Sequence, residues 1–392
     1  MNLIYLSYWG VEEGLTQSSV LPHLKILVKM AEVRSVYFFT VERYGKVAEQ
    51  ELEGVHHIPV YSKNIKPGVA NKINDFLLVR KAILDLTIRV ELQLMICRSA
   101  LAGAIGYLVY KKIRTPFIVE SFEPHADYML EAGVWNRFGL KYLFQKYWEK
   151  KVLKHASSIV AVSRHYADFI SSKRASQVYT FGCAVDLVAF SYDQSQREVI
   201  RNALGFQECL IGIYVGKFGD IYYDDKAFII FKRAFDYFGS RFRLIILTSN
   251  NKESVYFKID SVSINRLNVY VGKVPHHDVP YYLNAADFAF SMVKPSPFRK
   301  FCSPIKDGEY WANGLPILMG HGIGEDSEII RAEGGGALFK DDLSDLEEAF
   351  AQLGIYLDID RKKGIACHLA KKYRGFERLT GIYQQVLSQF QK

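Results

Sequence analysis

Short apolar runs alternate along this chain with segments of helical periodicity. The first two runs are LIYLSYW, from Leu3, and VYFFTV, from Val36, and a helical segment at about 18–30 separates them. Apolar runs of this kind are typical of buried parallel strands, and the helices between them return the chain to the same edge of the sheet. The alternation therefore predicts β-α-β units and an α/β fold.

The same alternation restarts in the second half of the chain. After FGCAVDLVAF comes the polar stretch SYDQSQREVIRN, and CLIGIYVG then opens a new series of strands. A chain of 392 residues is too long for one ordinary core, since single cores stop growing at roughly 250 to 300 residues. We expect Rossmann-like domains over 1–194 and 195–370, and two such sheets facing one another would form a cleft at the carboxyl ends of their strands.

The net charge of +8 favours anionic partners. These could be nucleic acid, phosphorylated ligands or an acidic membrane surface. Lysine and arginine are spread along the chain, and no RNA-binding or helix-turn-helix signature stands out, so we expect no nucleic-acid partner. Phosphorylated ligands and a membrane surface remain.

The cysteines and the N-terminus indicate a cytoplasmic protein. Five scattered cysteines form no C-x-x-C pair, which favours a reducing compartment. The start, MNLIYLSYWG, reads as a first strand and lacks the features of a signal peptide, and the longest apolar stretch is too short to span a bilayer. Peripheral contact with the inner face of a membrane stays open.

The stretch YVGKFGDIYYDDKAF has the features of a phosphate-binding turn. Gly216 and Lys217 directly follow a strand, in a loop that leads to a helix. Free N–H groups and the helix dipole favour an anion there, and Lys217 and Lys226 could add two cationic donors. The match is neither a Walker A loop nor a dinucleotide fingerprint, and two solvated surface lysines would explain the stretch as well.

The stretch SPIKDGEYWANGLPIL predicts a short helix that leads into a buried strand. Ser303 suits the N-cap, Pro304 the first helical position and Gly314 the residue past the end. Lys306 and Glu309 are then neighbours on one helix face. They could form an exposed ion pair of about 0.2 to 0.5 kcal/mol, or a carboxylate for ribose hydroxyls beside a lysine for phosphate, and spacing alone leaves both open.

Taken in order, these stretches resemble the retaining glycosyltransferases of the GT-B fold, of the family-four type, also called glycosyl transferases group 1. SPIKDGEY followed by GLPIL is similar to their donor-site signature, and FGCAVDLVAF to the segment that closes their first domain. VPHHDVPYYLNAADFAF and EGLTQSSVLPHLKIL are similar to further landmarks. The resemblance implies two facing Rossmann-like domains with a cleft between them, and a helix over 371–392 that returns to the first domain.

The same resemblance implies an activity. The chain would be a metal-independent hexosyltransferase without a cofactor, moving a sugar from a UDP-, GDP- or similar nucleotide sugar to an acceptor hydroxyl with retention. The acceptor would be a glycan or a lipid-linked molecule, in bacterial-type polysaccharide or glycolipid assembly. Prearranged cations would stabilise the departing diphosphate.

Site residues follow from the resemblance position by position. Those implied to be catalytic are Lys217, Lys226 and His125. The donor would be bound by Gly216, Lys306, Glu309 and, in the loop GHGIGEDSEII, by Gly322, Gly324 and Glu325. The acceptor side would include Gly14, Gln17, Glu120 and Glu123.

Several positions depart from the family pattern. Phe301 stands where many members carry the first of two glutamates, and Lys217 replaces an arginine, which loses bidentate phosphate geometry. The phenylalanine keeps two alternatives open: a non-catalytic nucleotide-sugar-binding or scaffold relative, and a GT-B sugar-nucleotide epimerase.

Three other stretches receive plainer interpretations. The doublets His56-His57 and His276-His277 lack a third metal ligand of convincing spacing, so we expect no metal site. The run from Asp358 to Asp360 is expected at the surface of a late helical region. WNRFGLKYLFQKYWEKKVLKH, from Trp135, mixes aromatic and basic residues and could be a helix packed on the sheet or a membrane contact.

Overall fold

The computed structural model describes residues 1–47, 54–63, 68–172, 177–357 and 364–391. The chain divides into two compact units: Met1–Ala184 with Phe376–Lys392, and Val185–Gly375. The sequence-based boundaries lie at 194/195 and 370/371, whereas the units divide at 184/185 and 375/376. The run from Asp358 to Asp360 falls outside the described residues.

Two sets of contacts explain the earlier boundary. The backbone N–H of Val185 donates to the carbonyl oxygen of Arg374 at 3.0 Å. Helix α8 (Gln194–Leu204) is held by Arg197 and Arg201, whose guanidinium groups pair with Asp287 at 2.5 and 2.7 Å. The polar stretch after Ala184 is therefore part of the second unit.

The first unit is built on a seven-stranded parallel sheet of order β3-β2-β1-β4-β5-β6-β7. Its strands are β1 (Asn2–Ser7), β2 (Ser35–Glu42), β3 (Val55–Tyr61), β4 (Leu94–Arg98), β5 (Phe117–Phe122), β6 (Ser158–Ala161) and β7 (Val178–Thr180). Strands β1 and β2 match the predicted apolar runs LIYLSYW and VYFFTV.

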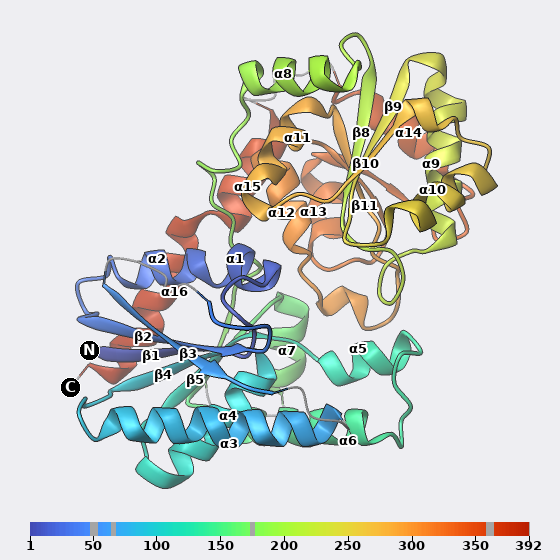
Figure 1. Ribbon diagram of the computed structural model, residues 1–392. Helices are drawn as coiled ribbons and strands as arrows, with labels where there is room; N and C mark the ends of the chain where they lie inside the picture. Colours follow the sequence, from blue (N-terminus) through green and yellow to red (C-terminus); the bar gives the residue numbers. More distant parts are fainter. Residues whose placement is uncertain (48–53, 64–67, 173–176, 358–363, 392) are drawn as a thin grey trace. The chain divides into compact units, whose positions relative to one another are not determined.

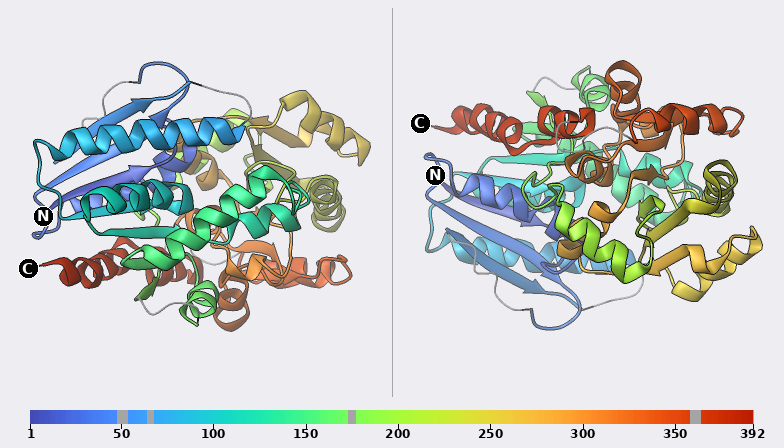
Figure 2. Two further views of the ribbon diagram at one scale, coloured as in Figure 1. Left: turned by 90° about the horizontal axis from the view of Figure 1, so that it is seen from below. Right: turned by 90° about the horizontal axis from the view of Figure 1, so that it is seen from above.

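Helices cover both faces of this sheet (Figure 1). One face carries α1 (Gly14–Ser19), α2 (Leu21–Leu27) and the C-terminal α16 (Phe376–Leu387); the other carries α3 (Gly68–Thr87), α4 (Ser99–Ile113) and α6 (Leu140–His155). Figure 2 shows the C-terminal helix lying along the first unit in both further views. Short helices α5 (His125–Glu131) and α7 (Arg164–Ser171) complete the unit.

The second unit repeats the architecture with a six-stranded parallel sheet of order β10-β9-β8-β11-β12-β13. Its strands are β8 (Leu210–Val215), β9 (Phe242–Leu247), β10 (Val269–Gly272), β11 (Phe288–Ser291), β12 (Ile317–Gly320) and β13 (Gly336–Phe339). One apolar core lies against α9 (Asp225–Phe238), α10 (Lys252–Ser261) and α14 (Leu346–Gly354). The other lies against α11 (Val279–Ala285), α12 (Ile305–Ala312), α13 (Asp326–Glu333) and α15 (Ile365–Arg374).

The strand orders place a switch point in each sheet. Strand order reverses direction between β1 and β4 in the first unit, and between β8 and β11 in the second. Ligands of open α/β sheets bind at such a point, outside the carboxyl ends of the strands. The edge after β8 is where the sequence places Gly216 and Lys217.

Local signals predicted some helix ends and missed others. Ser163, a favourable N-cap residue by type, caps α7, because its Oγ accepts the N–H of Tyr166 at 3.2 Å. The segment at 18–30 forms two helices, α1 and α2, since Pro22 lacks the N–H that would continue the first. Helix α12 begins at Ile305, and the Oγ of Ser303 accepts from Arg374 rather than capping it.

Gly212 lies in the middle of β8, and a substitution there tests how tightly the core of the second unit is packed. A Cβ at this position would lie 2.6 Å from Phe290 and 3.0 Å from Phe242 and Phe288. We expect Gly212→Ala to lower the free energy of unfolding by about 1 to 3 kcal/mol, because a full core must move to admit the methyl group. The matched control is Gly354→Ala in α14, where nothing lies within 4 Å; an equal loss of stability in both variants in thermal denaturation would contradict the packing argument.

Candidate functional site

The loop after β8 has the predicted strand-loop-helix form. Gly216 follows Val215, the last residue of β8, and α9 begins at Asp225. The hydroxyl of Tyr214 reaches over Gly216 to donate to the carbonyl of Lys217 at 2.5 Å, and a Cβ on Gly216 would lie 2.8 Å from that hydroxyl. Glycine thus lets the chain pass close beneath the tyrosine at the edge of the sheet.

Both lysines of this loop are held by carboxylates. The Nζ of Lys217 lies 2.5 Å from Asp220, and the Nζ of Lys226 lies 2.8 Å from Asp341, just after β13. Lys226 also donates to the backbone oxygen of Asp341 at 2.9 Å and lies over the Tyr223 ring. All four charged groups are partly exposed, so an incoming phosphate could exchange with the carboxylates.

On α12, Lys306 and Glu309 form the predicted pair, and His276 joins it. Lys306 Nζ lies 2.6 Å from Glu309 Oε2, and His276 Nε2 lies 2.9 Å from Glu309 Oε1. Glu309 is 2 % exposed. Burial alone would raise the pKa of Glu309, but Lys306 and His276 outweigh it and the pKa is lowered. Glu309 is therefore a buried, ionised carboxylate, whereas its partner Lys306 is partly exposed.

Tyr310 ties this helix to the glycine loop. Its hydroxyl accepts the backbone N–H of Val215 at 2.9 Å, directly before Gly216. Because Tyr310 follows Glu309, this bond fixes the carboxylate relative to the end of β8. The structure thus brings the two donor-side stretches of the sequence together.

The loop after β12 closes against the same region. The N–H of Gly324 donates to the carbonyl of Arg299 at 2.9 Å, and a Cβ on Gly324 would lie 2.3 Å from the carbonyl oxygen of Cys302. Gly322 and Gly324 both have positive φ, at +76° and +53°. Glu325 follows as the residue before α13.

The position of the expected first glutamate is filled by a buried ring. Phe301 ends the turn Arg299–Phe301 and lies in the interior, with its ring centroid 6.1 Å from that of Phe298. Arg299, two residues earlier, is also buried. The apolar side chain is thus part of the packing beneath the loop.

Sequence reasoning missed a buried acidic cluster under α12. Arg374 pairs with both oxygens of Asp326 at 2.6 Å, and Asp307 lies beside them with no exposed surface. Burial raises the pKa of Asp307, and Asp326 raises it further. On α12 Asp307 is turned by about 100° from Lys306 and by about 200° from Glu309. This difference in direction is the sequence signal that could have placed it on another side of the helix.

On the acceptor side, His125 and Glu123 lie together. His125 begins α5, just after β5, and its Nδ1 lies 3.7 Å from Glu123 Oε1. The His125 ring contacts Trp135 edge to face at 5.5 Å. All three side chains are half-buried, so this part of the predicted site is accessible at the carboxyl edge of the first sheet.

Gly14 and Gln17 belong to the loop and helix after β1. Gly14 begins α1, and a Cβ on it would meet nothing within 4 Å. Gln17 donates from Nε2 to the carbonyl of Val11 at 2.7 Å. Glu42, at the end of β2, accepts the N–H of Val11 at 2.8 Å. Gln17 and Glu42 therefore hold the loop in shape.

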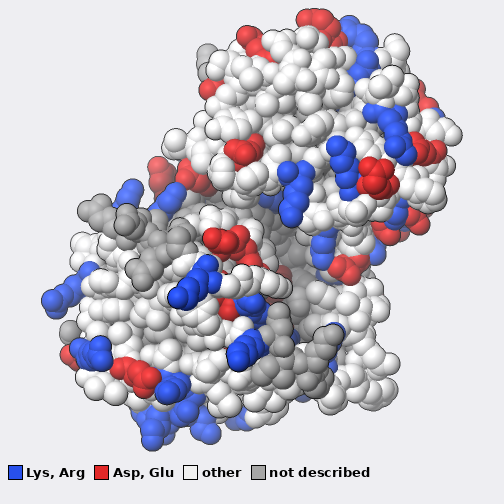
Figure 3. Space-filling model, in the orientation of Figure 1, with Lys and Arg blue, Asp and Glu red and all other residues white. Residues whose placement is uncertain are grey.

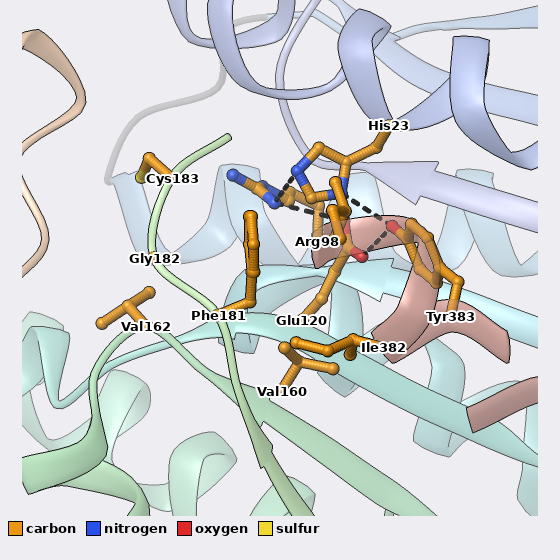
Figure 4. A pocket seen from close by; sticks show the side chains of 11 residues that line it. His23, Arg98, Glu120, Val160, Val162, Phe181, Gly182, Cys183, Ile382 and Tyr383 are labelled. Carbon is orange, nitrogen blue, oxygen red and sulfur yellow. Dashed lines mark hydrogen bonds and ion pairs between the residues drawn. The ribbon is translucent and has the colours of Figure 1, made fainter. Parts of the chain in front are cut away.

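Glu120 lies in a different place from the other acceptor-side residues. It is buried in a pocket between the sheet, α2, α16 and the segment around Gly182 (Figure 4). Its oxygens accept from Arg98 at 3.2 Å and from the hydroxyls of Tyr5 and Tyr383. The pKa of Glu120 falls to about 2: burial would raise it, but His23 and Arg98 outweigh burial. An acceptor hydroxyl would have to displace these donors.

Charged side chains of both signs lie on the surface seen in Figure 3. They are interspersed over both units. Across the described ranges, no group of three or more histidine, cysteine, aspartate or glutamate side chains is arranged to hold a metal ion. Nor does any helix in those ranges have the length and apolar character needed to cross a membrane.

Comparison with solved structures identifies the architecture. A sucrose-phosphate synthase from Thermosynechococcus elongatus matches with a TM-score of 0.80 at 14 % identity, over 99 % of this chain and 98 % of that chain. Anabaena HepE in complex with UDP and glucose matches at 0.70 and 14 %, over 99 % and 100 %. The fold is GT-B.

WaaG, a glycosyltransferase involved in lipopolysaccharide biosynthesis, shares the GT-B architecture, with a TM-score of 0.69 at 13 % identity over 97 % of this chain and 99 % of that chain. No protein-family model and no curated protein sequence matches the chain. At these identities the likeness establishes the GT-B fold alone.

Asp307 gives the second unit a pH-dependent stability. Because its pKa is raised on folding, the unfolded chain releases this proton first, and the group lowers the free energy of unfolding as pH rises above about 4. Asp307→Asn keeps the shape of the protonated aspartate side chain but cannot ionise. We expect its stability relative to wild type to grow by up to about 1.4 kcal/mol per pH unit until the folded pKa is reached.

The measurement is denaturant unfolding of both proteins between pH 5 and 8. Glu348→Gln, at an exposed position on α14, is the control and should follow the wild-type pH profile. A constant difference between Asp307→Asn and wild type across this range would show that Asp307 is ionised in the folded protein.

Proposed function

We propose that this GT-B protein is a retaining glycosyltransferase that moves a hexose from a nucleotide diphosphate sugar to an acceptor hydroxyl. The observation that carries the proposal is the buried Glu309, paired with Lys306 and His276 and tied through Tyr310 to the Gly216 loop. An ionised carboxylate beside a phosphate-type turn suits a ribose linked to a diphosphate. The structure of HepE with UDP and glucose favours a UDP-sugar as the donor.

The lysines would act on the leaving group. As the bond between the sugar and the diphosphate breaks, negative charge grows on the phosphate oxygens, and fixed cations lower the energy of that state. Lys217 and Lys226 would exchange Asp220 and Asp341 for the phosphates, with Lys306 assisting. Because lysines and loop N–H groups carry this role, we propose a reaction that needs no divalent metal or cofactor.

For retention, the acceptor would attack from the face that the diphosphate leaves. Its hydroxyl oxygen forms the new bond to the anomeric carbon, the old bond to the phosphate oxygen breaks, and the hydroxyl proton passes to that phosphate. His125 and Glu123 would orient the acceptor hydroxyl by hydrogen bonds. Gly322, Gly324 and Glu325 would approach the donor from the loop after β12.

The proposed setting is glycan or glycolipid assembly at the inner face of a membrane. The similarity to WaaG supports that setting, and the surface of α6 supports membrane contact. Phe138, two residues before α6, and Leu140, its first residue, are 83 % and 70 % exposed. Three lysines of the same helix, Lys141, Lys150 and Lys154, are also exposed, so apolar groups and positive charge suit an anionic bilayer.

Donor recognition is tested with two variants in the second unit. We expect UDP-glucose to raise the melting temperature of the wild type, since a ligand bound only by the folded state stabilises it, and Glu309→Gln to lose most of this shift. Lys226→Ala should slow the release of glucose from UDP-glucose by about 100-fold, the typical cost of one transition-state donor. Lys232→Ala, on the same helix and paired with Asp236, is the matched control.

Other outcomes of this assay point to the alternatives. Binding without turnover, for a range of donors and acceptors, would favour a scaffold that binds nucleotide sugars, which the buried Phe301 already motivates. Interconversion of two sugar nucleotides without acceptor would indicate an epimerase. No thermal shift with any nucleotide or nucleotide sugar would contradict the donor site itself.

Membrane contact is tested by sedimentation with vesicles that contain 30 mol % (about one third) phosphatidylglycerol, a composition that gives a strongly negative surface. We expect the double variant Phe138→Ser, Leu140→Ser to reduce the bound fraction severalfold, because it removes the exposed apolar groups. Phe257→Ser, at a residue of the second unit that is also exposed, serves as the control. Equal binding by all three proteins would contradict the assigned surface.

A further inference from the structure

A cationic cluster lies at the carboxyl edge of the first sheet, and its residues Lys72 and Arg43 belong to no motif that the sequence singled out. Lys72 is in the first turns of α3, and its Nζ lies 5.7 Å from the centroid of the Trp135 ring and 5.8 Å from that of Phe144. Arg43 directly follows β2 and lies 4.9 Å from the ring centroid of Tyr8, which follows β1. Loops after two strands and the start of α3 thus meet at one edge.

The charge of Lys72 is not balanced by its surroundings. Burial lowers the pKa of Lys72, and Lys141 and Arg43 lower it further, with only Asp75 acting in the opposite direction. Asp75 is already engaged, because it accepts from Tyr8 at 2.5 Å, from Arg43 at 2.8 Å and from Ser62. Within the described residues, no carboxylate forms an ion pair with Lys72.

Contacts with the aromatic rings offset only part of the cost of placing the Lys72 ammonium group here. A cation over an aromatic ring at an accessible site gains only a small electrostatic attraction. That gain must offset partial desolvation of an ammonium and repulsion from two neighbouring cations. A bound anion would remove both costs, since a charge-assisted hydrogen bond to a phosphoryl oxygen is among the strong ones.

We propose that Lys72 binds a phosphoryl group of the acceptor, beside the Trp135 ring and on the same edge as His125. The inference rests on the proposed transfer reaction, because it concerns the acceptor of that reaction. Trp135 links Lys72 to His125, because its ring contacts the ammonium group of Lys72 and the ring of His125. The phosphoryl group would lie at Lys72, a sugar ring against Trp135, and the reacting hydroxyl toward His125.

Two sources could carry this phosphoryl group. A soluble sugar phosphate and a glycan linked to a lipid through a diphosphate present the same oxygens to the lysine. Both carriers share the phosphoryl group, and a comparison of transfer to soluble and to lipid-linked acceptors separates them.

The first test is a lysine-labelling experiment on the full chain. The protein is acetylated with an N-hydroxysuccinimide ester, and the labelling rate of Lys72 is followed by mass spectrometry of its peptide. We expect inorganic phosphate or glucose 6-phosphate, at ten times its dissociation constant, to slow labelling of Lys72 about tenfold. Glucose should have no effect, and the exposed Lys150 should be labelled at the same rate throughout.

Three results of this test would overturn the proposal. The first is equal protection by glucose and glucose 6-phosphate, and the second is no protection at tens of millimolar phosphate. The third is no labelling of Lys72 in the free protein, because an amine that phosphate can reach is also accessible to the reagent. The readout does not depend on the donor. Protection of Lys72 without a response to any nucleotide sugar would leave the anion site and refute the proposed transfer. Hydrolysis of a donor without protection of Lys72 would leave the transfer and refute the anion site.

The second test measures transfer from UDP-glucose to paired acceptors that differ only in a phosphoryl group. The pairs are glucose with glucose 6-phosphate, fructose with fructose 6-phosphate, and a short glycan with the same glycan on polyprenyl diphosphate. We expect the phosphorylated member of a pair to be preferred, with product in the aqueous phase for a soluble carrier and in the organic phase for a lipid. Preference for every neutral member would refute the proposal.

Variants at Lys72 separate charge from packing. Lys72→Met keeps the apolar stem and should lower kcat/KM for the preferred phosphorylated acceptor by about 10- to 100-fold, toward the value for its neutral partner. Lys72→Arg keeps the charge and should retain most of the preference. Lys81→Met, at an exposed lysine of the same helix α3, is the matched control and should behave as wild type. An unchanged preference in Lys72→Met would overturn the assignment.

Discussion

The ion pair between Arg374 and Asp326 connects the donor-side helices to the place where the chain enters and leaves the second unit. Arg374 is the last residue of α15, and its carbonyl accepts the N–H of Val185, the first residue of the unit. Its side chain crosses beneath α12 to the start of α13, and it also holds Ser303. One buried arginine therefore holds the chain crossing through its backbone carbonyl and both helices through its guanidinium. Breaking a buried pair of this kind leaves an uncompensated charge, so its loss would disturb all three.

Gly308 shows how closely these parts are fitted. A Cβ on Gly308 would lie 2.8 Å from Val185 and 3.2 Å from the stem of Arg374, so α12 presents bare backbone to the crossing segments. The opposite side of the same helix carries Lys306 and Glu309 toward the edge of the sheet. Two faces of this eight-residue helix thus have different roles. One face packs in the interior and fixes the helix, and the other carries the ionised carboxylate of Glu309.

How much of this could be predicted from sequence depends on the separation of the partners. The loop at Gly216, the cap at Ser163, and the pairing of Lys306 with Glu309 follow from neighbours within a few residues, and the structure has all three. Arg374 with Asp326, and His276 with Glu309, join residues far apart in the chain, which no local pattern reveals. The start of α12 illustrates the limit: Ser303 is a good N-cap by type, but its hydroxyl is taken by Arg374. Glu120 likewise follows the pattern of a strand-end carboxylate until α16 brings Tyr383 onto it.

The return of α16 to the first unit has a consequence for the order of events during synthesis. Tyr383 bonds to Glu120 and His23, residues made 263 and 360 positions earlier, and Leu379, Val386 and Leu387 belong to the same apolar core. The second unit, by contrast, is one continuous segment. As the chain emerges from the ribosome, the later unit can therefore complete its core while the earlier one still lacks a helix. The N-terminal unit is therefore completed after the second unit has been synthesised, and one face of its sheet stays uncovered until α16 has emerged.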